Sequence, residues 1–209
     1  MAETSSFSGN VTVQGDLTVR GDIHPVLARD RLEQNSGQIY VQKLTDLRVF
    51  DALHTNLPGT AAGDDLELTG GTFGTNSPTV QTGDVASSNT TRYARMLMEL
   101  PPEYVAGETV TIRCFAGMKT TISDTTATID IECYESDKEE GIGSDLCVTS
   151  AISINSLTFA NADFTITATA LSPGDVLDVR VTIAVNDGAT GTAVIGVLGS
   201  LELLLDIKG

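Results

Sequence analysis

Residues 91–118 read TRYARMLMELPPEYVAGETVTIRCFAGM, and this stretch decides the fold class. Apolar residues occupy every second position on both sides of a double proline, first Ala94, Met96, Met98 and Leu100, and then Val110, Ile112, Cys114 and Ala116. Such alternation turns one face of a strand toward a core and the other toward solvent. A double proline ends a strand, because proline has no backbone N–H to donate. The stretch therefore predicts two successive β-strands joined by a turn.

The same alternation continues toward the end of the chain. It recurs in residues 127–133, 177–185 and 201–207, with shorter candidate strands at about Leu146–Ser150, Ile152–Phe159 and Phe164–Ala168. The sequences Pro173-Gly174-Asp175 and Asn186-Asp187-Gly188 supply turn signals. About eight short strands separated by such turns are typical of a sandwich or barrel. We therefore predict an all-β chain in which residues 91–209 form an antiparallel β-sandwich, most simply a jelly roll.

The residues before 91 lack this regular pattern and divide into two segments. Residues 1–35 are expected to form an extended N-terminal arm and a connector, and residues 36–90 an irregular, loop-rich linking region. Within the latter, Tyr40–Leu57 combines strand-like residues with a possible short helix or clasp over Leu44–Leu53. Pro58–Val85 is rich in Gly, Thr, Asn and Ser, with candidate strands at Leu66–Leu68 and Thr72–Gly74. Loops of this length in a compact domain are usually functional or disordered.

A six-residue repeat opens the arm. Gly9–Gln14 reads GNVTVQ, Gly15–Arg20 reads GDLTVR, and Gly21-Asp22-Ile23 begins a third copy. Each unit combines a turn with a strand that is too short to bury its own apolar side chains. Three chains wound around one axis could pool these side chains in a shared core. The repeat could instead add to the sheet edge of another protein, or pack as a hairpin on its own domain.

The distribution of charge limits the partners. The formal net charge is −16, from 12 basic and 28 acidic residues. Residues 1–50 hold 5 basic and 6 acidic residues, a net of −1, so residues 51–209 carry the other −15. A strongly acidic body repels nucleic acid and anionic membranes, and neither is expected as a partner. The near-neutral front is the better candidate for docking, although solubility alone also accounts for the charge.

No motif for nucleophilic catalysis is present. The two histidines, His24 and His54, lie outside any nucleophile motif. The spacing of Cys114, Cys133 and Cys147 fits no zinc or redox motif, so these residues are predicted to be buried thiols. Residues 1–10 lack the basic and apolar regions of a signal peptide, and no run of 18 apolar residues occurs, so neither export nor a membrane span is expected.

Two acidic clusters are the remaining candidates for chemistry. The cluster Asp64-Asp65-x-Glu67 and the run Glu135–Glu140 lack the arrangement of an EF-hand. We interpret both as solvated loops, with loose Ca²⁺ binding as the alternative. We therefore expect no enzyme activity and no cofactor. A hydrolase whose carboxylates pair only in space is the competing hypothesis.

Two turn motifs carry a resemblance to a known family. The run Leu100-Pro101-Pro102-Glu103-Tyr104, followed by Gly107, and the run Leu171–Asp175 stand at expected strand ends. Together with the repeat in Gly9–Arg20, they resemble the jelly-roll virion proteins of tailed phages, and among these the head decoration, or cement, proteins. The resemblance implies a homotrimer seated at local three-fold points of an icosahedral capsid. The arm would hold the major capsid protein and the jelly roll would face outward. The family supplies no catalytic residues.

The sequence thus predicts a structural virion protein that reinforces a phage capsid by trimeric binding across capsomer junctions. It would be made in the bacterial host cytoplasm and reside on the capsid exterior. The candidate trimer or capsid interface consists of apolar positions in and after the arm: Val11, Val13, Leu17, Val19, Ile23, Tyr40, Leu44, Leu47 and Phe50. The alternative is a receptor- or glycan-binding module of a phage fibre or spike, with Pro58–Val85 and Glu135–Ser144 as candidate surfaces. The acidic body disfavours a DNA-facing capsid shell protein.

Overall fold

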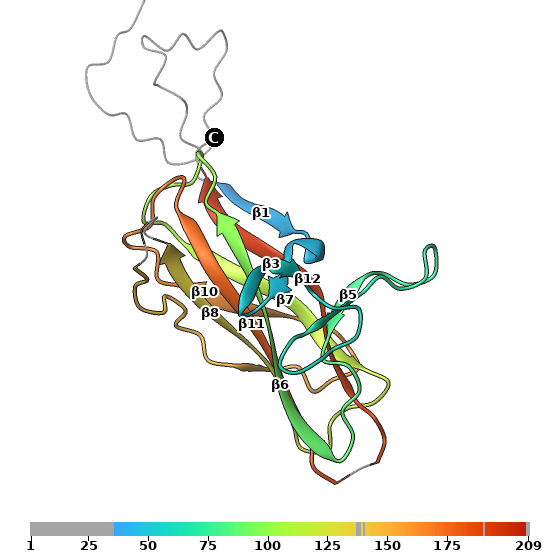
Figure 1. The fold of residues 1–209 in the computed structure, drawn as a ribbon. Helices are drawn as coiled ribbons and strands as arrows, with labels where there is room; N and C mark the ends of the chain where they lie inside the picture. Colours follow the sequence, from blue (N-terminus) through green and yellow to red (C-terminus); the bar gives the residue numbers. More distant parts are fainter. Residues whose placement is uncertain (1–35, 137–138, 140, 190, 208–209) are drawn as a thin grey trace, which may run out of the picture. The chain divides into compact units, whose positions relative to one another are not determined.

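The computed structural model describes residues 36–136, 139, 141–189 and 191–207, and this part of the chain is almost entirely β-structure. Its strands form two six-stranded sheets that make a sandwich (Figure 1). Among the described residues the one helical element is a single 3₁₀ turn, η1 (Leu44–Asp46). No helix in this part of the chain is long and apolar enough to cross a membrane. The predicted all-β class and antiparallel sandwich are confirmed.

The chain passes back and forth between the two sheets. The first sheet has the order β10-β7-β12-β5-β4, with β1 also paired to β12, and the second has the order β3-β2-β6-β11-β8-β9. The first contains β1 (Ser36–Gln42), β4 (Glu67–Thr69), β5 (Thr79–Gln81), β7 (Val110–Lys119), β10 (Ala160–Ile166) and β12 (Ile195–Ile207). The second contains β2 (Arg48–Val49), β3 (Ala52–Asn56), β6 (Ser88–Glu99), β8 (Thr126–Ser136), β9 (Ile152–Ser153) and β11 (Val176–Asp187). Strands β5 to β8, and again β10 to β12, change sheet at every step, which is the winding of a jelly roll.

The core lies between the sheets and is built from alternate residues of the long strands. Along β7, β8 and most of β11, buried side chains alternate with more exposed ones. Met98 from β6, Phe164 from β10 and Leu203 from β12 are each at most 1% exposed. Burial of this kind contributes roughly 25 cal/mol per Å² of apolar surface. The period-two pattern of the sequence is therefore the pattern of the core.

The two turn motifs noted in the sequence pack against each other. Leu100 N donates to Asp175 O at 2.8 Å, and Gly174 N donates to Leu100 O at 2.9 Å. Gly107 has a φ of 78°, which favours glycine, and its N–H donates to Leu171 O at 3.0 Å. Tyr104 is fully buried, its hydroxyl donates to Glu108 O at 2.6 Å, and burial raises its pKa. These motifs join strand ends within the fold.

The three cysteines are free thiols. Cys114 and Cys133 are completely buried, and burial raises the pKa of both thiols far above the ordinary value. Cys147 is half-buried, and burial raises its pKa as well. A thiol held in its protonated form is a poor nucleophile. The prediction of buried thiols is confirmed for Cys114 and Cys133.

Residues 36–90 differ from the loop-rich linking region that the sequence suggested. They contribute β1, β4 and β5 to the first sheet and β2 and β3 to the second. The possible helix in Leu44–Leu53 is limited to η1. Thr72–Gly74 forms a turn and no strand, with Thr75 N and Asn76 N both donating to Thr72 O at 2.9 Å. Strands of two to five residues are too short to show a clear period, and only pairing with longer strands fixes them.

Phe164→Ala tests how much the core depends on one aromatic side chain. Phe164 is 0% exposed, so we expect a loss of about 3–5 kcal/mol in the free energy of unfolding. Phe73→Ala is the matched control, because Phe73 is 103% exposed, and we expect a change within about 0.5 kcal/mol. Urea denaturation followed by circular dichroism measures both. Equal losses in the two variants would contradict the described core.

Candidate functional site

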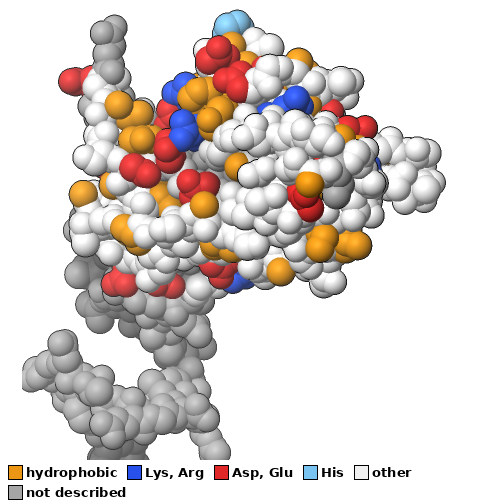
Figure 2. Space-filling model, turned by 90° about the horizontal axis from the view of Figure 1, so that it is seen from below, with side chains coloured by type: hydrophobic (Ala, Val, Ile, Leu, Met, Phe, Trp, Pro, Cys, Tyr) orange, Lys and Arg blue, Asp and Glu red, His pale blue; other side chains and the backbone are white. Residues whose placement is uncertain are grey.

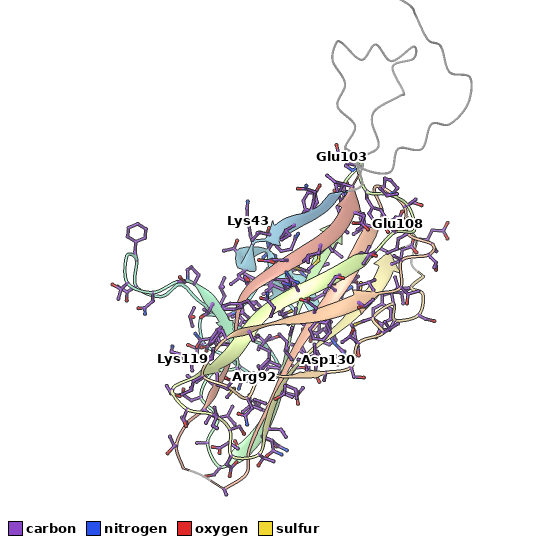
Figure 3. All side chains as sticks on the ribbon, turned by 180° about the vertical axis from the view of Figure 1, so that it is seen from behind. Lys43, Arg92, Glu103, Glu108, Lys119 and Asp130 are labelled. Atoms are coloured by element: carbon purple, nitrogen blue, oxygen red, sulfur yellow. The ribbon has the colours of Figure 1, made fainter. Side chains whose placement is uncertain are left out.

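A hollow of about 400 Å³ opens on the outer face of the first sheet, and we name it the sheet hollow. It is bounded by β4, β5, β7, β12 and the hairpin loop between β4 and β5, residues 70–78. Its lining includes Thr69, Thr79, Gln81, Lys119, Phe159 and Val197. In Figure 3 the labelled Lys119 lies near the base of the loop that projects from the sandwich. This volume falls in the range of pockets that hold small ligands.

Phe159 forms the apolar wall of the sheet hollow. Its ring rests against two glycines: a Cβ atom on Gly117 of β7 would lie 2.5 Å from Phe159 Cδ1, and one on Gly199 of β12 would lie 3.6 Å from Cδ2. Any side chain at Gly117 would therefore occupy the place of the ring. Phe159 also meets Phe115, with ring centroids 5.7 Å apart and planes inclined by 51°, a tilted arrangement that aromatic pairs favour.

The loop that carries Phe159 is fastened to the sandwich by hydrogen bonds. Met118 N donates to Ser156 O at 2.8 Å. Ser123 N donates to Asn155 Oδ1 at 2.8 Å, and Asn155 Nδ2 donates back to Ser123 O at 3.0 Å. A ring that is already held in place loses little conformational entropy when a ligand packs on it. Phe159 is therefore a preorganised surface.

The opposite wall of the sheet hollow is a network of hydroxyl and amide groups. Gln81 is 4% exposed, and its Nε2 donates to Thr79 Oγ1 at 2.6 Å and to Thr69 Oγ1 at 3.0 Å. The two threonine hydroxyls lie 3.1 Å apart, within hydrogen-bonding distance. Both amide hydrogens of Gln81 are thus engaged, which leaves its Oε1 oxygen as an acceptor for a ligand hydroxyl.

The sheet hollow combines an aromatic ring, small hydroxyl groups and the amides of Asn76 and Gln81, with Lys119 as the charged residue of its lining. No carboxylate, histidine or cysteine lines it within the described part of the chain. Such a surface can bind a ligand through apolar contact and neutral hydrogen bonds.

A second, smaller hollow of about 250 Å³ lies on the outer face of the second sheet. Strand register places Arg48, Arg95, Arg180 and Glu132 in one row across β2, β6, β11 and β8. Like charges in neighbouring strands are destabilising unless they are compensated. Here Arg95 Nε donates to Asp178 Oδ1 at 2.7 Å, and Arg180 pairs with Glu132. The hydrogen bond to Asp178 raises the pKa of Arg95.

Aromatic rings complete this charged row. The Arg180 guanidinium carbon lies 5.2 Å from the ring centroid of Phe50 and 5.0 Å from that of Tyr93. The centroids of these two rings are 5.2 Å apart. Cation–π contacts of this kind favour the charged guanidinium. Because Arg95 is already paired with Asp178 and Arg180 with Glu132, we interpret the row as the device that fastens the Phe50 turn to the second sheet.

Of the nine residues predicted to form an interface, the structure describes four, and these four do not share one exposed surface. Tyr40 and Leu44 are partly buried and pack on the core, and Leu47 is 1% exposed. Leu47 therefore belongs to the core and not to a surface that a partner could reach. Phe50 stacks on Arg180. The other five predicted interface residues, Val11, Val13, Leu17, Val19 and Ile23, lie outside the described residues.

The acidic cluster Asp64–Glu67 lies in a loop and at the first residue of β4. Glu67 is 8% exposed and its Oε2 accepts a hydrogen bond from Ala61 N at 2.7 Å. Burial raises the pKa of Asp65. Within the described residues no group of three or more histidine, cysteine or acidic side chains could hold a metal ion.

The sequence pointed to part of the sheet hollow and missed the rest. Pro58–Val85 was considered as a candidate surface, and it contains Thr69, Thr79 and Gln81. Phe159 was assigned to a short strand, and nothing in its neighbourhood marks it as exposed. The available signal was the presence of Gly117 and Gly199 inside strand patterns, since glycine within a strand can mark a close approach of another group.

Comparisons with known proteins identify no family. No family model matches the chain, and no curated protein matches it. Among solved structures, TmCBM61 in complex with β-1,4-galactotriose shares 10% identity over 83% of this chain and 88% of its own, with a TM-score of 0.33. A candidate sugar-binding protein from Bacteroides thetaiotaomicron VPI-5482 shares 8% identity over 78% of this chain and 86% of its own, with a TM-score of 0.35. Similarity at this level says nothing about what this chain binds.

Gly117→Ala tests the seat of Phe159. The new Cβ atom would overlap the ring, so we expect the free energy of unfolding to fall by about 1–3 kcal/mol. In a Phe159→Ala background the overlap is gone, and the same substitution should cost less than about 0.5 kcal/mol. Gly143→Ala is the control, because nothing lies within 4 Å of a Cβ atom there. Equal costs in both backgrounds, measured by urea denaturation, would contradict this packing.

Proposed function

We propose that this chain is a non-catalytic module that binds neutral saccharides in the sheet hollow and serves as a glycan-binding part of a larger appendage. The supporting observation is the braced Phe159 ring on one wall, with the Gln81, Thr69 and Thr79 network on the other. A sugar ring presents apolar C–H groups on its faces and hydroxyl groups around its rim. The faces suit an aromatic ring, and the hydroxyl groups suit neutral donors and acceptors.

The charge around the sheet hollow favours an uncharged ligand. Residues 68–82 contain no charged residue, although the chain as a whole has a net charge of −16. An acidic ligand would be repelled by the acidic body at long range. A basic ligand would find no carboxylate in the lining of the sheet hollow among the described residues. A neutral polyhydroxylated ligand meets neither obstacle.

Two substitutions test the proposed site by isothermal titration calorimetry with neutral gluco-, galacto- and manno-oligosaccharides of one to six units. For the saccharide that wild-type protein binds, we expect Phe159→Ala to lower the affinity by about tenfold or more, because it removes the apolar wall. Gln81→Leu should weaken it about threefold to tenfold, because an amide acceptor and its network are lost. Gln42→Leu on β1, outside the sheet hollow, is the control. Full binding by both site variants would contradict the site, and no binding by wild-type protein would contradict the function.

A second candidate function is the structural one suggested by the resemblance, in which three copies seat on a capsid and hold the major capsid protein. The observation in its favour is β1, the strand that directly follows residues 1–35. Its Ile39 and Val41 side chains are 55% and 68% exposed on the outer face of the first sheet. Among the described strands β1 pairs with β12 alone. An edge strand with exposed apolar side chains is a template for pairing with another chain.

Val41→Lys tests this second candidate. If copies associate through β1, wild-type protein should scatter light with three times the chain mass of 21.9 kDa, and Val41→Lys should return the mass to that of one chain, because a charge at a pairing edge opposes association. Val148→Lys is the matched control, since Val148 is 66% exposed and lies outside β1, and it should keep the wild-type mass. A monomeric wild-type protein would remove this candidate and leave the saccharide proposal in place.

A further inference from the structure

The hairpin loop between β4 and β5 presents one fully exposed aromatic side chain. Phe73 is 103% exposed, the highest value among the large hydrophobic residues described. The loop extends away from the sandwich beside β5 (Figure 1). Elsewhere the exposed hydrophobic side chains form small separate groups on an acidic surface, as the face shown in Figure 2 illustrates. Keeping an aromatic ring in water forgoes the stabilisation that its burial would contribute.

The conformation of the hairpin loop is fixed by backbone hydrogen bonds and by glycines with positive φ. Thr75 N and Asn76 N both donate to Thr72 O at 2.9 Å. Gly71 and Gly74 have φ values of 65° and 77°, which favour glycine. A Cβ atom at Gly71 would lie 2.8 Å from Asn76 Cβ and 2.9 Å from Asn76 O, so the two arms of the loop touch there. The position of Phe73 at its end is therefore specified by backbone geometry.

The loop is continuous with the sheet hollow. A concave surface of about 530 Å³ runs along residues 70–78 and ends at Phe73. Gly71, Asn76 and Ser77 line both this surface and the sheet hollow. Residues 69–79, which run from the sheet hollow to the loop that carries Phe73, contain no charged residue and offer mainly hydroxyl, amide and backbone groups. Lys119, on the sheet hollow lining, is the one charged residue among the described residues that line either surface. One extended neutral ligand could follow this path from ring to ring.

We infer that Phe73 is a second, outer binding position for a neutral saccharide chain whose first unit occupies the sheet hollow. This inference rests on the proposed function. The sheet hollow would hold one unit between Phe159 and the Gln81 network. The next units would lie along the hydroxyl-rich side of the hairpin loop, and an outer unit would pack its apolar face on Phe73. Phe73 would thus set the chain length that the protein prefers, because only longer chains reach it.

Phe73→Trp turns this inference into a direct measurement. The chain contains no tryptophan, so the substitution introduces the sole indole fluorophore at the loop tip. We expect its emission to shift to shorter wavelength when an oligosaccharide of several units is added, and to stay unchanged with the corresponding monosaccharide. Val148→Trp, on an exposed residue outside both hollows, is the control and should show no shift. Phosphatidylcholine vesicles are the second probe, and they should produce no shift.

Phe73→Ala supplies the affinity arm of the same test. We expect it to weaken the binding of the longer oligosaccharide by about tenfold and to leave monosaccharide affinity within about twofold of wild type. Equal oligosaccharide affinities in Phe73→Ala and wild-type protein would overturn the role of Phe73 while the proposed function stands. If Phe159→Ala loses oligosaccharide binding and Phe73→Ala behaves as wild type, the role of Phe73 is likewise overturned and the proposed function stands. A wavelength shift with vesicles and none with saccharides would assign the loop to a lipid surface instead, and saccharide binding by no form of the protein would overturn both proposals.

Discussion

The pairing of β12 with three other strands holds the first sheet together. Along one edge β12 pairs with β7, and along the other it pairs first with β5 at Val197 and Leu198 and then with β1 from Leu201 to Ile207. An irregularity between Leu198 and Ser200, at Gly199, separates the two parts. Because β5 and β1 occupy successive parts of one edge of β12, the sheet hollow and the exposed face of β1 both depend on β12. The sheet hollow is built around β5, and the exposed apolar pair Ile39 and Val41 lies on β1.

This division of one edge explains how a single domain could both attach and bind. β1 begins beside the last residues of β12, since Ser36 pairs with Ile207. The sheet hollow lies farther along β12, where Val197 contributes to its lining. Attachment through β1 would therefore leave the sheet hollow and its hairpin loop accessible. The two candidate functions are physically compatible, although each is tested by its own measurement.

Glycine decides where aromatic side chains can lie on the sandwich. On the inner face, a Cβ atom at Gly196 would come within 2.8 Å of Ile183 Cγ2, so this glycine lets the two sheets approach closely. On the outer face, the absence of side chains at Gly117 and Gly199 lets the Phe159 ring pack directly on the sheet. In the hairpin loop, Gly71 allows the two arms to touch. The ring of Phe159 is thus positioned by missing side chains, and the missing side chain at Gly71 lets the loop that carries Phe73 close.

The sequence by itself determined the fold class and the long strands, because the side chains of a half-buried strand must alternate. Met96 and Met98, Ile112 and Cys114, and Val179 and Val181 were predicted to point into a core, and all are buried. The turns around Pro101 and Pro173 were also predicted from the sequence, because proline fixes φ and glycine adopts the positive φ that turns require. Only the tertiary structure decided the rest. Short strands such as β4 and β5 exist through pairing, β4 with β5 and β5 with β12. Leu47, where an interface was expected, is interior, and the sheet hollow joins Gln81 to Phe159 across 78 positions of sequence. No local pattern can show such a meeting, because it depends on which strands lie side by side.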